Sequence, residues 1–439
     1  MLSHCINSSR LKLQVTPMLI CKVALLACFI PTRGSVFGIN SGTLLVACCF
    51  AQFLLTRRKV RIPVFYIVYT LFMAVCIVYH FATRTPYIHL IQICQIVGLV
   101  YIVLAAVRGN RKKFDELIDY VVIIASIYGL FGIIESFLKL NIFDILTGTE
   151  VVYEYANALR FGLARSRGAT GTSINNGMLL CLMEGIVAYR LINCNSKKKL
   201  YTAAYIIVFI NCFCTLSRGV WLDFAISQAL IFCMLRGDKK LMLVLKVIAV
   251  SAVVFVLGMF LFPEAINGIV GIFNSMMEST IVSLSGESQG DQMGGIGDRL
   301  ELWGWVWIAT QGSLTWGKGF NSAFAYLTSA GAIKESIEVM WLYMLYRTGF
   351  VGMVGFILLQ LGSLKYSIHS HLTELKSKIM PRGKVGFNYI FFSVSIAYYI
   401  AMFSCAGSED LVFYYFFIGL LFSYNETNET GILVRNSIE

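Results

Sequence analysis

Five arginines stand next to apolar segments at positions where they could bind an anionic group. Arg160, Arg165 and Arg167 precede an apolar block that starts near residue 175. Arg218 lies between two further blocks, and Arg299 precedes a tryptophan-rich segment. A guanidinium binds phosphate oxygens through paired hydrogen bonds, so several arginines directed at one cavity would form a diphosphate site. The candidate ligands of this site are Arg165, Arg167, Arg218 and Arg299.

No comparable pattern of residues predicts a metal site or a cofactor site. Most of the 13 cysteines lie inside apolar blocks, where cysteine behaves as a small hydrophobic residue. The pair Cys212-x-Cys214 has neither a metal-binding nor a redox spacing. No Asp-x-Asp pair of the kind that holds a divalent ion in nucleotide-sugar transferases occurs. We therefore predict no metal site and no cofactor.

The elements that position these arginines must be membrane helices. Charged residues are only 14% of the chain and AVILMFWYC make up 57%, whereas about a quarter of a soluble domain is charged. This composition excludes a soluble enzyme, a secreted disulfide module and a disordered chain. The net charge is +12. The sequence has no Lys/Arg-rich arm of the kind that binds nucleic acid, so the charge does not predict a nucleic-acid partner.

Hydropathy divides the chain into twelve apolar blocks of a length that fits membrane-spanning helices. We predict an all-α, polytopic transmembrane bundle of about twelve helices, with residues 1–439 forming a single integral membrane domain. The predicted spans are residues 14–30, 36–56, 62–82, 87–107, 117–138, 175–189, 200–216, 219–235, 241–262, 338–362, 386–404 and 410–424.

The basic loops predict the orientation, because Lys and Arg accumulate on the cytoplasmic side of a membrane. With the N-terminus inside, the clusters at 57–61, 108–113, 197–199, 236–240 and 365–384 all become cytoplasmic, and so does the C-terminus. We interpret the first block as an uncleaved helix and not as a signal peptide. All six tryptophans then fall on the exterior side, where their rings favour the membrane interface.

Only two connections are long, residues 140–174 and 263–337, and both lie on the predicted exterior side. Long loops tend to carry function. In the second, Asp298 is a candidate N-cap, and Leu300, Trp303, Trp307 and Gln311 follow at helical spacing. We expect a short helix there that lies on the membrane surface.

Four ionisable residues fall within or next to predicted spans: Glu135, Glu184, Asp223 and Arg347. A charge at the bilayer centre costs roughly 2.5 to 3.5 kcal/mol on insertion scales. We therefore expect these side chains to face a cavity or to pair with one another.

Short motifs between residues 155 and 360 connect these observations. They are Arg165-x-Arg167-Gly168 with Asn175-Asn176, Ser217-Arg218-Gly219, Arg299-x-x-x-Trp303 with Gly317-Lys318-Gly319, and Leu342-x-x-Leu345-x-x-x-Gly349-x-x-Gly352. In order and spacing they resemble motifs of the O-antigen polymerase and O-antigen ligase superfamily. Ligases of this superfamily have a His-Asn pair where this chain has Glu338-Val339, which favours a polymerase.

The resemblance implies a glycosyltransferase of the bacterial inner membrane that polymerises undecaprenyl-diphosphate-linked oligosaccharide repeat units on the periplasmic side. The four arginines would then bind the diphosphate, and Glu338, in the position of the ligase histidine, becomes the candidate catalytic base. Membrane lipids are partners, and the resemblance also allows a chain-length regulator protein. Two alternatives remain: an O-antigen ligase, and a flippase or other transporter of lipid-linked oligosaccharides.

Overall fold

The computed structural model describes most of the chain. The described residues are 15–29, 40–56, 60–81, 86–148, 159–160, 163–235, 296–320, 322–327, 333–334, 337, 339–376, 384–403 and 408–436. The predicted span 241–262 lies outside them.

Helices dominate the described part of the chain, as predicted. They are α1 (Pro17–Ala27), α2 (Ser41–Leu55), α3 (Val64–Phe81), α4 (Pro86–Ile93), the π-helical turn η1 (Cys94–Gly98), α5 (Leu99–Val107), α6 (Arg111–Leu138), α7 (Ile142–Thr147), α8 (Ser173–Asn193), α9 (Lys198–Cys214), α10 (Arg218–Cys233), α13 (Ile296–Thr310), α14 (Met340–Lys376), α15 (Phe387–Ala401) and α16 (Ser408–Asn436). Two antiparallel pairs join the short strands β1 (Leu159–Arg160) with β2 (Leu163–Ala164) and β3 (Tyr326–Leu327) with β4 (Ile333–Lys334).

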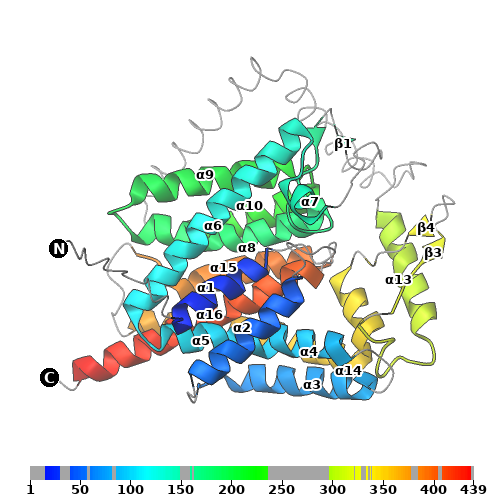
Figure 1. Cartoon of the computed structure of the whole chain (residues 1–439), viewed down its shortest axis with the longest axis horizontal. Helices are drawn as coiled ribbons and strands as arrows, with labels where there is room; N and C mark the ends of the chain where they lie inside the picture. Colours follow the sequence, from blue (N-terminus) through cyan, green and yellow to red (C-terminus); the bar gives the residue numbers. More distant parts are fainter. Residues whose placement is uncertain are drawn as a thin grey trace, which may run out of the picture.

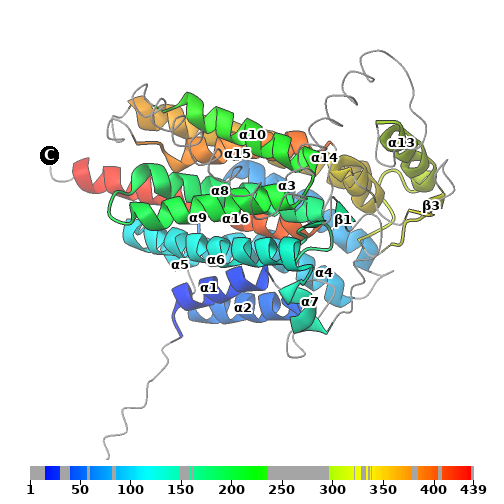
Figure 2. The same cartoon turned by 90° about the horizontal axis from the view of Figure 1, so that it is seen from above.

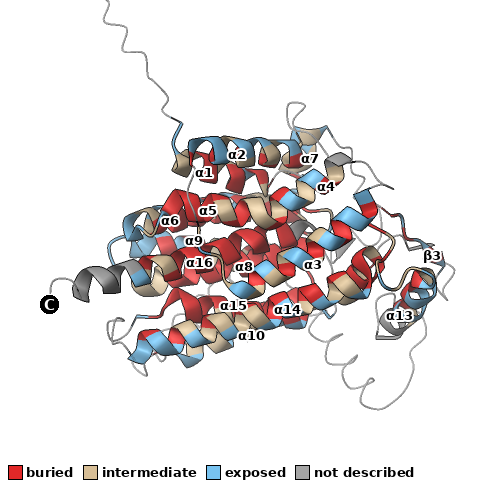
Figure 3. Ribbon diagram, turned by 90° about the horizontal axis from the view of Figure 1, so that it is seen from below, coloured by how far each residue is buried: buried red, intermediate tan, exposed pale blue. Residues whose placement is uncertain are grey.

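Most helices lie side by side as a bundle, and α13 stands crosswise beyond one end of it (Figures 1 and 2). The centre is formed by α16 and α8, which are buried on all sides over much of their length (Figure 3). Every residue from 411 to 425 is buried, and Phe413, Tyr414 and Phe417 are 0% exposed. Such a helix has no polar face because neighbouring helices surround it.

The outer helices expose apolar side chains instead. Along α3, Val64, Ile67, Leu71, Val75 and Val78 are exposed, and their spacing places them on one stripe of the helix. Helices α3, α6 and α14 and the segment Ile88–Val107 are each long and apolar enough to cross a membrane. Shorter apolar helices accompany them at Pro17–Ala27, Ser41–Leu55 and Phe387–Ala401. The chain is a multi-pass membrane protein.

The two ends of the bundle differ in their polar contacts. At one end, which we call the basic end, Arg190 Nε lies 2.6 Å from Asp119 Oδ1 and Arg190 Nη1 lies 3.0 Å from Asp115 Oδ1. Lys197 Nζ lies 3.2 Å from Asp119 Oδ2. Two clusters predicted to be cytoplasmic, 108–113 and 197–199, therefore adjoin the same ion-pair network. We call the opposite end, which holds segment 163–172, the loop end.

Helix boundaries differ from the hydropathy blocks where polar residues continue the helix. Helix α6 begins at Arg111, not at 117, because the Asn110 side chain caps it by accepting from Lys112 N at 2.9 Å. Helix α14 continues to Lys376, beyond the predicted end at 362. Helix α13 begins at Ile296, so the prediction of Asp298 as its N-cap was wrong, and Asp298 lies inside the first turn.

A second, smaller core lies at the loop end. It joins Leu302 and Val306 of α13 with Phe324 and Tyr326, and with the start of α14 through Val339, Leu342 and Tyr346. This core fixes α13 against α14 and turns the remaining faces of α13 outward.

Candidate functional site

The turn between α9 and α10 is held by a complete set of hydrogen bonds. The last carbonyls of a helix lack partners within it, and here each of three finds one nearby. Cys212 O accepts from Trp221 Nε1 at 3.2 Å, Phe213 O from Leu216 N at 3.0 Å, and Cys214 O from Ser166 N at 2.9 Å. These bonds hold the turn in place directly before Arg218, the first residue of α10.

Leu216, in the middle of this turn, has a φ of +50°. The left-handed region is rarely occupied by a residue with a branched side chain. Backbone conformations of this kind cost about 1 to 3 kcal/mol and concentrate at functional sites. The Ser217-Arg218-Gly219 motif thus follows a strained residue that its surroundings hold in place.

Segment 163–172 lies against this turn and brings a second arginine to it. Arg165 Nε donates to Thr215 O at 3.2 Å, three residues from Arg218 in the sequence. The side chains of Arg165 and Arg218 are both partly exposed. Two of the predicted phosphate ligands, from separate parts of the sequence, therefore come from adjoining backbone segments at the loop end.

A buried polar cluster holds segment 163–172 in position. Asn176 Nδ2 donates to Ser166 O at 3.1 Å, and Ser166 Oγ donates to Asn211 Oδ1 at 2.8 Å. Tyr128 donates its hydroxyl to Asn176 Oδ1 at 2.8 Å. Helices α6, α8 and α9 each contribute a side chain, so the segment is fixed by three helices together.

Position 168, next to this polar cluster, requires a glycine. Its φ is +54°, and a Cβ there would lie 2.3 Å from the Tyr128 hydroxyl. Any larger residue would displace that hydroxyl, which accepts from Ala169 N at 3.1 Å. The glycine of the Arg-x-Arg-Gly motif therefore has a packing role.

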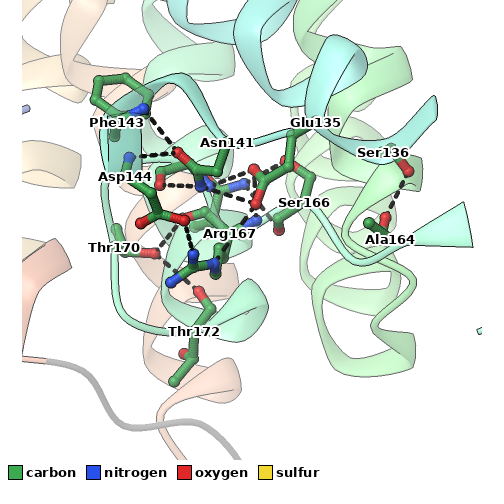
Figure 4. A network of polar contacts seen from close by, with 12 residues as sticks. Glu135, Ser136, Asn141, Phe143, Asp144, Ala164, Ser166, Arg167, Thr170 and Thr172 are labelled. Atoms are coloured by element: carbon green, nitrogen blue, oxygen red, sulfur yellow. Dashed lines mark hydrogen bonds and ion pairs between the residues drawn. The ribbon is translucent and has the colours of Figure 1, made fainter. Parts of the chain in front are cut away.

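The guanidinium of Arg167 lies next to the carboxylates of Asp144 and Glu135 (Figure 4). It pairs with Asp144 of α7 and lies 3.6 Å from Glu135 Oε1 of α6. Glu135, which is 1% exposed, also accepts from the backbone N–H of Gly168 at 2.9 Å and from Asn141 Nδ2 at 2.8 Å. Burial raises the pKa of Asp144, and the positive charge of Arg167 opposes this rise.

These ion pairs restrict the guanidinium of Arg167. The guanidinium of Arg167 would have to leave two carboxylates before it could bind a phosphate. Removal of one partner from a buried ion pair destabilises a protein by roughly 3 to 5 kcal/mol. We therefore expect Arg167→Ala to lower the thermal unfolding midpoint strongly. An unchanged midpoint for this variant would contradict this assignment.

A third segment at the loop end is inserted into a break in α14. Gly349 has φ +65° and ψ −166°, which divides the helix into residues 340–348 and 350–376. Lys318 N donates to Tyr346 O at 2.7 Å, Gly319 N to Arg347 O at 2.9 Å, and Phe350 N to Leu314 O at 2.8 Å. Backbone from segment 312–320 thus replaces the helical hydrogen bonds that the break removes.

This segment is also attached to α3. Trp316 stacks on Tyr79 with ring centroids 4.8 Å apart, and Trp316 O lies 2.8 Å from His80 Nε2. The Gly317-Lys318-Gly319 motif and the Gly349 motif, predicted separately, therefore contact each other. A Cβ on Gly349 would lie 2.3 Å from Thr315 O, and a Cβ on Gly317 would lie 2.5 Å from Gly349 N.

The four ionisable residues of the predicted spans meet different partners. Glu135 pairs with Arg167, as described. Glu184 accepts from the Gln228 side chain. Arg347 donates to carbonyls of the inserted segment, including Phe320 O at 2.7 Å. Asp223 is 2% exposed. Glu135 therefore forms an ion pair as expected, although its partner is Arg167 of a loop segment and not another of these four residues. Arg347 binds backbone carbonyls in place of a carboxylate.

Two predicted site residues have side chains outside the described part of the chain. The backbone of Arg299 lies in α13, but its side chain is outside that part, and Glu338 lies wholly outside it. Among the described residues, no group of three or more His, Cys, Asp or Glu side chains could hold a metal ion. The predictions of no metal and no cofactor stay predictions.

Sequence reasoning missed several residues that build the site. Tyr128, Ser166 and Asn211 carry no motif and are recognised only through their contacts. Asn141 had a local signal, because Asn before an apolar turn is a common N-cap, and it accepts from Phe143 N at 2.8 Å.

Comparison with known families agrees with the predicted resemblance. Residues 203–357 match the family model described as O-antigen ligase. This range contains the α9–α10 turn, α13 and the break at Gly349, while segment 163–172 lies before it. The match confirms the resemblance to the O-antigen polymerase and ligase superfamily. No curated protein matches the chain.

Proposed function

We propose that this membrane protein is a metal-independent glycosyltransferase that polymerises undecaprenyl-diphosphate-linked oligosaccharide repeat units. The reaction would occur at the periplasmic face of the bacterial inner membrane, with both termini in the cytoplasm. One contact carries the proposal: Arg165 Nε donates to Thr215 O and so joins segment 163–172 to the turn before Arg218. Both lie at the end of the bundle opposite the basic end.

The proposed diphosphate site combines three positive contributions. Arg165 and Arg218 supply guanidinium groups, and the N-terminus of α10 adds the partial positive charge of its free N–H groups. Arg299 would add a further guanidinium from α13. In this proposal Arg167, with its two carboxylate partners, shapes the segment that presents Arg165.

The chemistry needs charge stabilisation and one proton acceptor. The bond between the anomeric carbon of the growing chain and its diphosphate oxygen breaks, and the diphosphate leaves with the electron pair. A sugar hydroxyl of the incoming repeat unit forms the new glycosidic bond and releases its proton. The arginines would stabilise the leaving diphosphate, and Glu338 would accept the proton, a contribution of roughly 10² to 10⁴ in rate.

The two long connections would form the exterior part of the enzyme. We propose that residues 140–174 and 263–337 are periplasmic loops of one membrane domain, and that α13 lies at the membrane interface. The described contacts support this grouping, because Asp144, Arg167 and Trp316 all lie at the loop end. A chain-length regulator protein would bind from the same side.

The direct test is incubation of the purified protein with a defined undecaprenyl-diphosphate-linked repeat unit. We expect products extended by whole repeat units on a gel. A preparation shown to be folded that extends no such substrate would be incompatible with the enzymatic proposal.

Metal removal provides a separate prediction. Because the leaving diphosphate is stabilised by arginines in this proposal, elongation should continue at an unchanged rate after dialysis against a chelator. Readdition of Mg²⁺ or Mn²⁺ should not increase it by more than about twofold, which is small beside the several kcal/mol that a catalytic cation contributes. Loss of elongation on chelation, with recovery on readdition of metal, would show that a cation participates.

An O-antigen ligase is the second candidate, since the matching family model is described as O-antigen ligase. The two activities leave different surface glycans in a deletion strain. Loss of a polymerase leaves the lipid core with one repeat unit, whereas loss of a ligase leaves no attached repeat. Loss of a flippase would instead trap single units on the inner leaflet.

A further inference from the structure

Helix α13 exposes three tryptophans to its surroundings. Trp303, Trp305 and Trp307 are 48%, 39% and 49% exposed, and Ile308 is 57% exposed. An exposed group of large aromatic side chains marks a ligand-binding surface or a contact with the membrane. We call the outward side of α13, with these three tryptophans, the tryptophan face.

The opposite side of α13 explains why the tryptophans point outward. Leu302 and Val306 are 2% and 0% exposed and pack in the second core with Tyr326 and Tyr346. Trp303 and Trp307 are one turn apart on one flank of the outward side, and Trp305 lies on the other flank. The helix itself lies beyond the end of the bundle (Figure 1), where the sugar part of a lipid-linked substrate would be.

Between the two flanks lie Gly304, Gln311 and the exposed Ile308. No described atom lies within 4 Å of a Cβ built on Gly304. Gln311 is exposed, and Glu301 accepts from Trp305 Nε1 at 3.3 Å. The face thus combines flat rings with hydrogen-bonding groups beside an exposed position that has no side chain. Sugars present the same combination, with C–H groups on the faces of the ring and hydroxyls around its edge.

Although the proposed function places α13 at the membrane interface, a lipid bilayer fits its outward face less well than a glycan does. A helix that inserts into the interface has a continuous apolar side and a polar side rich in Lys and Arg. Helix α13 has one basic residue, Arg299, and the centre of the outward side holds Gly304 and Gln311 beside Ile308, so its apolar surface is interrupted.

We propose that the tryptophan face binds the oligosaccharide part of the substrate by stacking sugar rings on Trp303 and Trp307. This inference rests on the proposed function and identifies where the glycan, as distinct from the diphosphate, is bound. The growing chain would leave the diphosphate site along α13, and each ring in contact would slow its release.

The test uses an oligosaccharide without its diphosphate. Mild acid releases this probe from the lipid-linked fraction of cells that make the protein. Binding to the full-length protein in phosphatidylcholine nanodiscs is titrated by tryptophan fluorescence and by saturation-transfer NMR. We expect the double variant Trp303→Ala/Trp307→Ala to raise Kd at least about tenfold, as is typical of buried tryptophan contacts. The matched control Ile308→Ala removes exposed apolar area without a ring and should change Kd less than about twofold.

Three results would overturn the inference. One is an unchanged Kd in the double variant with an unchanged thermal midpoint. Another is equal weakening by Ile308→Ala, which would indicate general apolar contact. The third is quenching of the fluorescence of Trp303 and Trp307 in nanodiscs with brominated acyl chains. If added oligosaccharide did not relieve this quenching, the face would be assigned to lipid.

The inference and the proposed function can fail separately. Wild-type protein that elongates the lipid-linked substrate but does not bind the free oligosaccharide would refute the glycan site alone. Protein that binds the oligosaccharide through Trp303 and Trp307 but never elongates would support the glycan site and contradict polymerisation.

Discussion

Arg218→Ala is expected to reduce elongation of a lipid-diphosphate-linked repeat unit by at least about 10²-fold, the usual effect of removing a group that stabilises developing negative charge. Arg218 is the first residue of α10 and follows the strained Leu216. Its guanidinium is therefore attached to a turn whose backbone is held in place by hydrogen bonds. The rate is measured from the ladder of products formed by purified protein.

Two control variants make this result specific. Arg218→Lys keeps the charge but loses the paired hydrogen bonds, so we expect an intermediate rate. Arg61→Ala removes an exposed arginine just before α3 and should leave the rate unchanged. If Arg218→Ala elongated normally while correctly folded, the diphosphate assignment would be wrong.

Gly349→Ala is expected to destabilise the protein by on the order of 3 kcal/mol, the upper end for a residue forced into a backbone region that only glycine occupies easily. The added Cβ would lie 2.3 Å from Thr315 O. Segment 312–320 would have to leave the break in α14, and its backbone hydrogen bonds would be lost. The thermal unfolding midpoint in detergent measures the effect.

The matched control for Gly349 is Gly304→Ala on α13. No described atom lies within 4 Å of the added Cβ, and alanine favours a helix over glycine by roughly 0.5 to 1 kcal/mol. We expect an unchanged or slightly higher midpoint. A midpoint for Gly349→Ala as high as that for Gly304→Ala would show that the break tolerates a side chain.

Hydropathy and charge predicted much of the fold because a membrane helix needs a long apolar run. Every predicted span except 241–262 overlaps a described helix. The ends of helices were less accurate, since Asn110 and the polar residues up to Lys376 extend helices through hydrogen bonding that hydropathy does not detect. Helix α7 and the strand pairs are too short to leave a pattern.

The candidate site was predicted in its residue types but not in its contacts. Arg165 and Arg218 come from adjoining segments, whereas Arg167 is held by Glu135 and Asp144. A single sequence shows that an arginine is present but does not show which carboxylate lies opposite it. For the same reason the insertion of segment 312–320 at Gly349 could not be predicted, since residues such as Leu314 and Phe350 meet only after folding.

The position of α16 at the centre of the bundle has a consequence for biosynthesis. Helices α5, α8 and α15 pack against it, yet α16 follows all of them in the chain and leaves the ribosome after them. Until then, the surfaces of these helices that will face Phe413, Tyr414 and Phe417 have only lipid or one another as neighbours. Assembly of the bundle is therefore completed after translation of most of the chain, and the nascent protein must stay loosely associated in the membrane until α16 is inserted.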